Sequence, residues 1–271
     1  MATSTLLGPN DIAVDHRNMV QRIVGIMRSS DEPMTLDDLA EMAGLSPFYF
    51  ARTFRSIVGL PPGEFQAALR FERAKHLLLS SPASVTEICF EIGYDSLGTF
   101  SSRFKRLVGM SPAQFRELPH IVADTDLEQR IEQNLLRPVG PSSSSVEGTI
   151  SSPVDVRSHV YVGLFADPIA ATRPITGRTL PGPGPFSLRD VPPGTWYLLS
   201  AALPAEGSPI DQLLPGPDVL VASGGPIVVR SNRERHIRPL TLRQPIPLDP
   251  PLLTALPALL VYHCASCNAR L

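Results

Sequence analysis

The sequence predicts a multidomain α and β protein, in which an all-α part precedes a part built from short β-strands. Residues 1–137 hold 8 of the 29 prolines and residues 138–271 hold the other 21, a density that long helices do not tolerate. Apolar residues recur at helical spacing in the first part and come in short runs between Pro-Gly turns in the second. We therefore expect a tail over 1–16, a helical domain over 17–118, a linker with a short helix over 119–145, a β-domain over 146–250 and a tail over 251–271.

Composition argues against several classes of protein, among them membrane-spanning, secreted and disulfide-rich proteins. No run of about 18 apolar residues occurs, and residues 1–10 lack a basic start and a long apolar stretch. We therefore expect no membrane span and no secretion signal, and a cytoplasmic location. The three cysteines, Cys89, Cys264 and Cys267, do not form a disulfide framework. The net charge of −2 argues against a generally basic surface but leaves room for a local basic patch.

Helix signals are dense in the first part. Thr35 and Asp38 have the spacing of a capping box, and so do Ser84 and Glu87. Ser46-Pro47 and Ser111-Pro112 each place a capping residue before a proline suited to the first helical position. A long helix is predicted from Pro62 to Leu79. One face of an earlier helix carries apolar residues at helical spacing, namely Met19, Val20, Ile23, Ile26 and Met27.

An internal repeat organises the helical part. The first copy, Leu36-x-x-Leu39-Ala40-x-x-Ala43-Gly44-Leu45, matches Val85-x-x-Ile88-Cys89-x-x-Ile92-Gly93-Tyr94. A glycine at the end of a short helix can adopt the left-handed conformation that a tight turn needs. The residues that follow then recur with a shift of 50, as Ser46, Phe50, Phe54, Val58, Gly59, Pro62 and Phe65 in one copy and Ser96, Phe100, Phe104, Val108, Gly109, Pro112 and Phe115 in the other.

Each copy predicts a helix-turn-helix, in which a Phe pair on the second helix packs against the first helix. The opposite face of that second helix is then free to enter a DNA major groove. A connecting helix of about 18 residues would be roughly 27 Å long at 1.5 Å per residue. Such a helix could hold two recognition helices about one DNA turn, roughly 34 Å, apart.

The stretch Val85–Arg116, VTEICFEIGYDSLGTFSSRFKRLVGMSPAQFR, resembles the signature of the AraC/XylS family of transcription regulators. The resemblance covers residues 17–118. It implies a homeodomain-like domain with two helix-turn-helix units joined by a linking helix, sequence-specific binding to double-stranded DNA, and bacterial origin.

The resemblance also implies which residues contact DNA. Base contacts are expected from the exposed face of each recognition helix, with Arg52 suited to bond a guanine edge twice. In the second unit Ser102 occupies a position where arginine is common in the family, so base discrimination is expected to depend more on the first unit. The expected base contacts are Phe48, Ala51, Arg52, Leu97, Gly98, Ser101 and Ser102, and the expected phosphate contacts are Ser46, Arg55, Ser96, Arg103, Lys105 and Arg106.

Charge along the chain agrees with a local basic footprint. Residues 46–120 carry nine basic and six acidic side chains, whereas residues 1–45 carry three basic and seven acidic ones. The basic surplus therefore begins at the first recognition helix.

The tail sequence His263-Cys264-x-x-Cys267 offers three ligands for zinc or a redox pair. A closed structural zinc site needs four ligands, and the nearest other histidine, His236, lies 27 residues away. We therefore expect no metal and no cofactor. Ser208 and His236 lie in no recognisable nucleophile turn, so an enzyme is not indicated.

The second part predicts an antiparallel β-sandwich. Its segment Pro185–Ala201, PFSLRDVPPGTWYLLSA, resembles carboxypeptidase-regulatory-like or transthyretin-like modules, which implies a fold and no particular chemistry. The predicted strands are Val146–Ser151, His159–Phe165, Phe186–Asp190, Thr195–Ala202, Asp218–Ala222, Ile227–Arg230 and Ile237–Leu242.

Three roles remain open for this β-domain: protein contacts, binding of a small effector, and no independent role. The leading hypothesis is a DNA-binding transcription regulator with an accessory β-domain, for which RNA polymerase is a candidate partner. The alternative is an interaction or sensor protein in which the β-domain dominates and the helix-turn-helix pair is degenerate. The operator, the target genes, the effector, the direction of regulation and the oligomeric state do not follow from the sequence.

Overall fold

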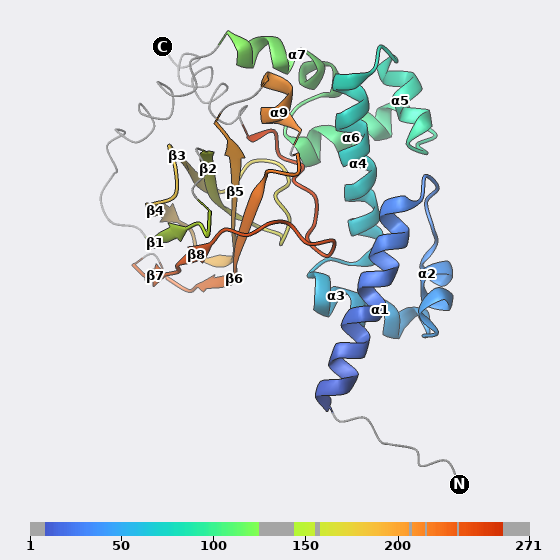
Figure 1. The fold of residues 1–271 in the computed structure, drawn as a ribbon, viewed down its shortest axis with the longest axis horizontal. Coiled ribbons are helices and arrows are strands. Elements are labelled where there is room, and N and C mark those ends of the chain that lie inside the picture. The colour runs from blue at the N-terminus through green and yellow to red at the C-terminus, as the bar shows by residue number, and fades with distance from the viewer. Residues whose placement is uncertain are drawn as a thin grey trace. The chain divides into compact units, whose positions relative to one another are not determined.

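The computed structural model describes residues 9–124, 144–154, 158–205, 208–214, 216–231 and 233–256 (Figure 1). Its internal contacts divide the chain into two units. The first contains residues 1–71 and 246–250, and the second contains residues 72–245 and 251–271. The second unit therefore holds the second helix-turn-helix together with the strands. The predicted short helix after residue 124 and the tail motif at His263 lie outside the described residues.

The first 124 residues are helical wherever the repeat predicts helices. The first helix begins at Pro9, inside the segment expected to be a tail. Within these residues the helices are α1 (Pro9–Ser29), α2 (Leu36–Ala43), α3 (Pro47–Val58), α4 (Pro62–Ser80), α5 (Val85–Glu91), α6 (Leu97–Val108) and α7 (Pro112–Ala123).

The predicted capping residues begin these helices. Thr35 and Ser84 each accept a hydrogen bond from the backbone N–H three residues on, and the carboxylates of Asp38 and Glu87 accept one in return. The hydrogen bonds that each carboxylate receives lower the pKa values of both Asp38 and Glu87. Ser111 forms a further capping box with Gln114 before Pro112. Local sequence therefore determines where these helices begin.

The strands form two sheets, one in the order β4-β1-β7 with β8 also paired to β1, and one in the order β3-β2-β5-β6. The segment Pro185–Ala201 makes a strand, a turn and a strand, as predicted, but its two strands belong to different sheets. The strands are β1 (Ser144–Ser151), β2 (Ser158–Phe165), β3 (Thr176–Leu180), β4 (Pro185–Val191), β5 (Gly194–Pro204), β6 (Leu220–Val229), β7 (Arg235–Ile237) and β8 (Leu240–Thr241).

The expectation of purely antiparallel pairing is wrong for two strands. Both β7 and β8 run parallel to β1, with Val146 opposite His236 and Ile150 opposite Leu240. At this point the chains approach closely, because a Cβ on Gly148 would collide with the Arg238 carbonyl group. Parallel pairing between segments about 90 residues apart depends on tertiary contacts, so the local sequence pattern does not predict it.

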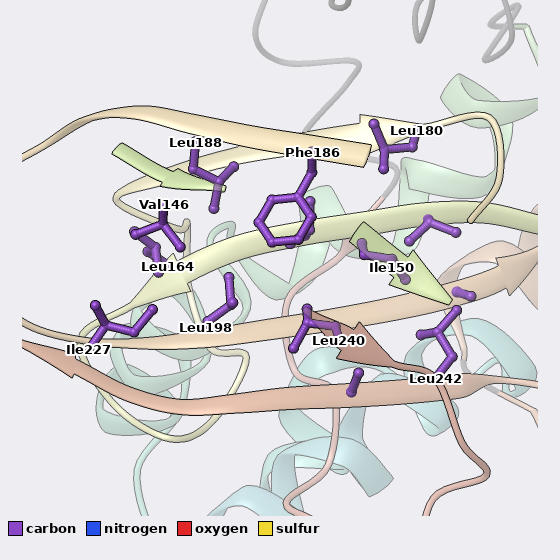
Figure 2. Close-up of a cluster of buried hydrophobic side chains, with 14 of the residues drawn as sticks. Val146, Ile150, Leu164, Leu180, Phe186, Leu188, Leu198, Ile227, Leu240 and Leu242 are labelled. Atoms are coloured by element: carbon purple, nitrogen blue, oxygen red, sulfur yellow. The ribbon is translucent and has the colours of Figure 1, made fainter. Parts of the chain in front are cut away.

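A buried cluster lies between the two sheets (Figure 2). Val146, Phe186 and Leu188 from the β4-β1-β7 sheet meet Leu164 and Leu198 from the other sheet. Trp196 packs against the same cluster, and its indole N–H donates to the Pro192 carbonyl oxygen at 2.8 Å. Successive side chains of a strand point to opposite faces of the sheet, and these residues occupy the positions that face the other sheet.

Two elements of the second part were not predicted from sequence, β3 and the short helix α9 (Pro209–Leu213). The two strands predicted over 218–222 and 227–230 are one continuous strand, β6. Because β6 is an edge strand, Pro226 interrupts no ladder on its outer side, and Gly225 adopts φ +69. The sequence Gly-Gly-Pro therefore marks an irregular edge rather than a turn.

Candidate nucleic-acid interface

The turns of the two helix-turn-helix units repeat almost bond for bond. Gly44 and Gly93 adopt φ +66 and +76, the left-handed region that favours glycine. The N–H of Gly44 donates to the carbonyl of Glu41 at 2.9 Å, and the N–H of Leu45 donates to that of Ala40 at 3.0 Å. Gly93 and Tyr94 make the equivalent bonds to Phe90 and Cys89 at the same distances. Asp95 lengthens the second turn by one residue, since the first helices are related by a shift of 49 and the second by 50.

The aromatic cores of the two units repeat as well. Phe50 and Phe54 have ring centroids 5.7 Å apart, and Phe54 and Phe65 are also 5.7 Å apart. Phe100, Phe104 and Phe115 repeat both distances, again at 5.7 Å. All of these rings are fully buried. The Phe residues therefore build the scaffold that orients α3 and α6, and they are not themselves available to DNA.

The exposed face of α3 carries the expected contact residues of the first unit. Phe48 is 79% exposed, the largest value among the exposed large apolar side chains of the described residues. Arg52 and Arg55 are exposed, and Ala51 is half-buried. Ser46 begins the helix, but its side chain makes no capping hydrogen bond.

The exposed face of α6 is more polar. Leu97 is 40% exposed, Gly98 and Ser102 are exposed, and Ser101 is half-buried. Among the expected phosphate contacts, Lys105 and Arg106 are exposed.

Two of the expected phosphate contacts on α6 already have partners within the protein. The hydroxyl of Ser96 accepts from the Thr99 N–H at 3.4 Å. The guanidinium of Arg103 donates to the Tyr94 hydroxyl at 3.3 Å. A hydroxyl and a guanidinium both keep further donors for a phosphate.

Charge is segregated between the helices of each unit. The helices α3 and α6 contain only basic ionisable side chains apart from Tyr49, whereas α2 and α5 contain only acidic ones apart from the buried Cys89. A phosphate backbone is attracted to the first kind of helix and repelled by the second. This distribution distinguishes the two faces of each unit.

Sequence reasoning did not single out Tyr49 and Phe90, which are 44% and 57% exposed. Tyr49 lies next to Phe48 and also meets the His16 ring of α1 edge-on at 5.8 Å. The signal for both was available, because each lies off the buried face of its helix in the repeat.

Of the predictions about cysteines, only the one for Cys89 falls on described residues. Cys89 is buried, as expected, with its sulfur 3.6 Å from the Tyr94 carbonyl oxygen, and burial and the charge of Asp95 raise its pKa. His263, Cys264 and Cys267 lie outside the described residues.

Among the described residues, no three His, Cys, Asp or Glu side chains are grouped so that they could hold a metal ion. None of the helices described is both long enough and apolar enough to span a bilayer.

Comparison with known proteins agrees with this geometry. Residues 39–118 match the family described as "Helix-turn-helix domain". The chain is 35% identical over 83 residues to the HTH-type transcriptional activator AarP of Providencia stuartii, covering 31% of this chain and 62% of that protein. It is 30% identical over 118 residues to the melibiose operon regulatory protein of Escherichia coli K12, covering 40% of this chain and 39% of that protein. The chain thus spans less than two thirds of the length of these curated relatives.

Among solved structures, the DNA-binding domain of AdpA in complex with a target DNA is 29% identical, with a TM-score of 0.33, covering 38% of this chain and 89% of that one. The C-terminal domain of AraT, a response regulator from Geobacillus stearothermophilus, is 33% identical, with a TM-score of 0.33, covering 42% and 88%.

Repeated turns, repeated aromatic cores and exposed basic second helices define a double helix-turn-helix of the DNA-binding class. Together with the family match over residues 39–118, they identify the helical part of this chain as a DNA-binding domain of the AraC type.

Proposed function

We propose that this protein is a sequence-specific DNA-binding transcription regulator in which α3 and α6 enter two successive major grooves. The observation that carries the proposal is the duplicated geometry, in which each second helix buries its Phe pair and exposes a basic face. The helix α4, with 19 residues, has about the length that the sequence predicts for the connecting helix.

In this proposal Arg52 reads a guanine edge, and Phe48, Ala51 and Leu97 offer apolar contact to thymine methyl groups. Gly98, Ser101 and Ser102 make close or weak polar contacts, so the first unit contributes more discrimination. Phosphate contacts come from the basic residues Arg55, Arg103, Lys105 and Arg106, and from Ser46 and Ser96 at the helix N-termini, where backbone N–H groups point outward.

The strand region is proposed to be a β-sandwich accessory domain. Its two sheets and shared buried cluster support this fold, although β7 and β8 depart from the antiparallel pattern. A role in contacts with other proteins, RNA polymerase among them, or with an effector remains part of the proposal.

Selection of duplexes from a random pool, followed by titration of the chosen duplex, tests the proposal. The wild-type chain should bind the selected duplex at 150 mM salt and prefer it to random duplex by at least about a thousandfold. Arg52→Ala should cost about 1–3 kcal/mol on the selected duplex and relax the preference at one base pair.

Arg55→Ala is the matched control on the same helix. As a phosphate contact, it should weaken binding to selected and random duplexes equally and reduce the salt slope by about 1. Binding without any preference between duplexes would favour the alternative, an interaction protein with a degenerate helix-turn-helix pair.

A further inference from the structure

Thr172 has an unusual backbone conformation. It lies between β2 and β3 and adopts φ +57, in the left-handed region. A β-branched side chain at positive φ is a genuine outlier, and such strain persists only where surrounding contacts hold it. The other non-glycine residue at positive φ among those described is Asp190, of a type that tolerates this region. Thr172 therefore marks a place where the fold enforces a strained residue.

The contacts of Thr172 lead to the second recognition helix. Its N–H donates to the carbonyl oxygen of Leu107 at 2.5 Å. Leu107 lies in the last turn of α6, where helix carbonyls lack partners within the helix. On its other side, the Thr172 carbonyl accepts from the Thr254 hydroxyl at 2.6 Å. Thr172, from the strand region, thus supplies a hydrogen-bond donor to a carbonyl at the end of α6. The Thr254 hydroxyl in turn binds the carbonyl of Thr172.

A buried layer supports this contact within the same unit. The carbonyl of Ala170 accepts from the N–H groups of Leu253 and Thr254 at 3.0 and 2.9 Å. Ala170, Leu253 and Thr254 are all at least nine-tenths buried. The fully buried ammonium of Lys75, from α4, donates to the Leu252 carbonyl at 2.8 Å and lies 5.7 Å from the centre of the Phe115 ring. The loop before β3 is therefore held by the segment 252–254, which is held in turn by a linking-helix side chain.

We propose that Thr172 and Thr254 are positioning residues for the second recognition helix, so that the strand region sets the orientation of α6 on DNA. The inference rests on the proposed function. Its reason is the weakness of the side chains on α6, where Gly98, Ser101 and Ser102 replace strong base contacts. A helix with weak contacts contributes to affinity only if little freedom is lost when it binds, which requires that it be held in advance.

Thr254→Val tests the inference in the full-length chain, because valine keeps the shape and removes the hydroxyl. Thr241→Val is the control, since it removes a threonine hydroxyl whose contact is with Ser151 on β1. The probes are the duplex selected with the wild-type chain and a shorter duplex that ends before the second half-site and therefore lacks the bases and phosphates that α6 contacts. Hydrogen–deuterium exchange of the Thr172 amide is measured in parallel, without DNA.

Thr254→Val should raise the exchange rate of the Thr172 amide several-fold. It should weaken binding to the intact duplex about fivefold, which corresponds to the loss of one hydrogen bond, and leave binding to the shortened duplex unchanged. Thr254→Ser should restore both properties, and Thr241→Val should affect neither. Thr254→Ala, which lacks the same donor, replaces the valine variant if that one fails to fold.

Equal weakening on both duplexes, or wild-type behaviour on both, would overturn the positioning role. If the wild-type chain binds no duplex selectively, the proposed function fails by itself. The exchange measurement then still decides whether Thr254 holds the Thr172 loop on α6: accelerated exchange supports that contact, and unchanged exchange refutes it.

Discussion

Lys75 offers a direct test of how the buried layer of the second unit is stabilised. Burial lowers the pKa of its ammonium from 10.5 to about 8, an effect that the charge of Glu72 partly opposes. Between these two values the unfolded chain binds a proton that the folded chain does not. The free energy of unfolding should therefore rise with pH in this window, by about 2–3 kcal/mol between pH 7 and 10 as far as Lys75 contributes.

Lys75→Met should abolish that rise. Methionine fills a similar volume without a charge, so the desolvation cost of the ammonium, roughly 3 kcal/mol at neutral pH, disappears. Against this gain, the Leu252 carbonyl loses its donor and Phe115 loses its cation, which together cost about 2–4 kcal/mol. The two effects nearly offset at pH 7, and the variant should differ from the wild-type chain by less than about 2 kcal/mol there.

Denaturant unfolding followed by Trp196 fluorescence is a suitable assay. Trp196 is the only tryptophan and lies in the same unit as Lys75. The difference between wild type and variant at each pH removes contributions from Cys89 and Tyr161, whose pKa values are raised by burial in both proteins. If the two proteins show parallel stability curves from pH 7 to 10, Lys75 is not desolvated in the folded chain and the reasoning fails.

Two further predictions concern backbone and caps. Gly148→Ala should cost more than about 3 kcal/mol, because its Cβ would meet the Arg238 carbonyl group, whereas Gly44→Ala should cost about 1–2 kcal/mol from its positive φ alone, since open space surrounds it. Trp196 fluorescence reports the first and helical circular dichroism the second, and equal costs would contradict the contact at Gly148. Ser84→Ala should lower stability by about 1 kcal/mol through loss of the capping bond to Glu87, and Ser80→Ala, which removes a bond within a helix, should cost less.

The helical part was predictable because its signals are local. The capping box of Ser84 and Glu87 spans three residues, and the left-handed backbone conformation of Gly93 depends on that residue alone. The repeat doubled each signal, so the second unit confirmed the interpretation of the first. The candidate interface was predicted from the same pattern, and of its residues Arg52 and Ser102 are exposed whereas Ala51 and Ser101 are half-buried.

The strand region was predictable only in part. Short apolar runs between turns located β1, β2, β4 and β5, but they could not show that β4 and β5 belong to different sheets. Thr176–Leu180 carries polar residues and glycine, so β3 was missed. The pairing of β1 with β7 and β8 joins segments about 90 residues apart, and no local pattern encodes such a choice.

By itself, the amino-acid order determined the helices, their caps, the duplicated turn and the faces that α3 and α6 leave exposed, because short-range hydrogen bonds and helical periodicity act within a few residues. Only the tertiary structure decided that β7 and β8 run parallel to β1, that Lys75 is buried beneath Leu252, and that Thr172 meets the end of α6. Each of these depends on bringing distant segments together, and their free energies appear only once the packed core exists.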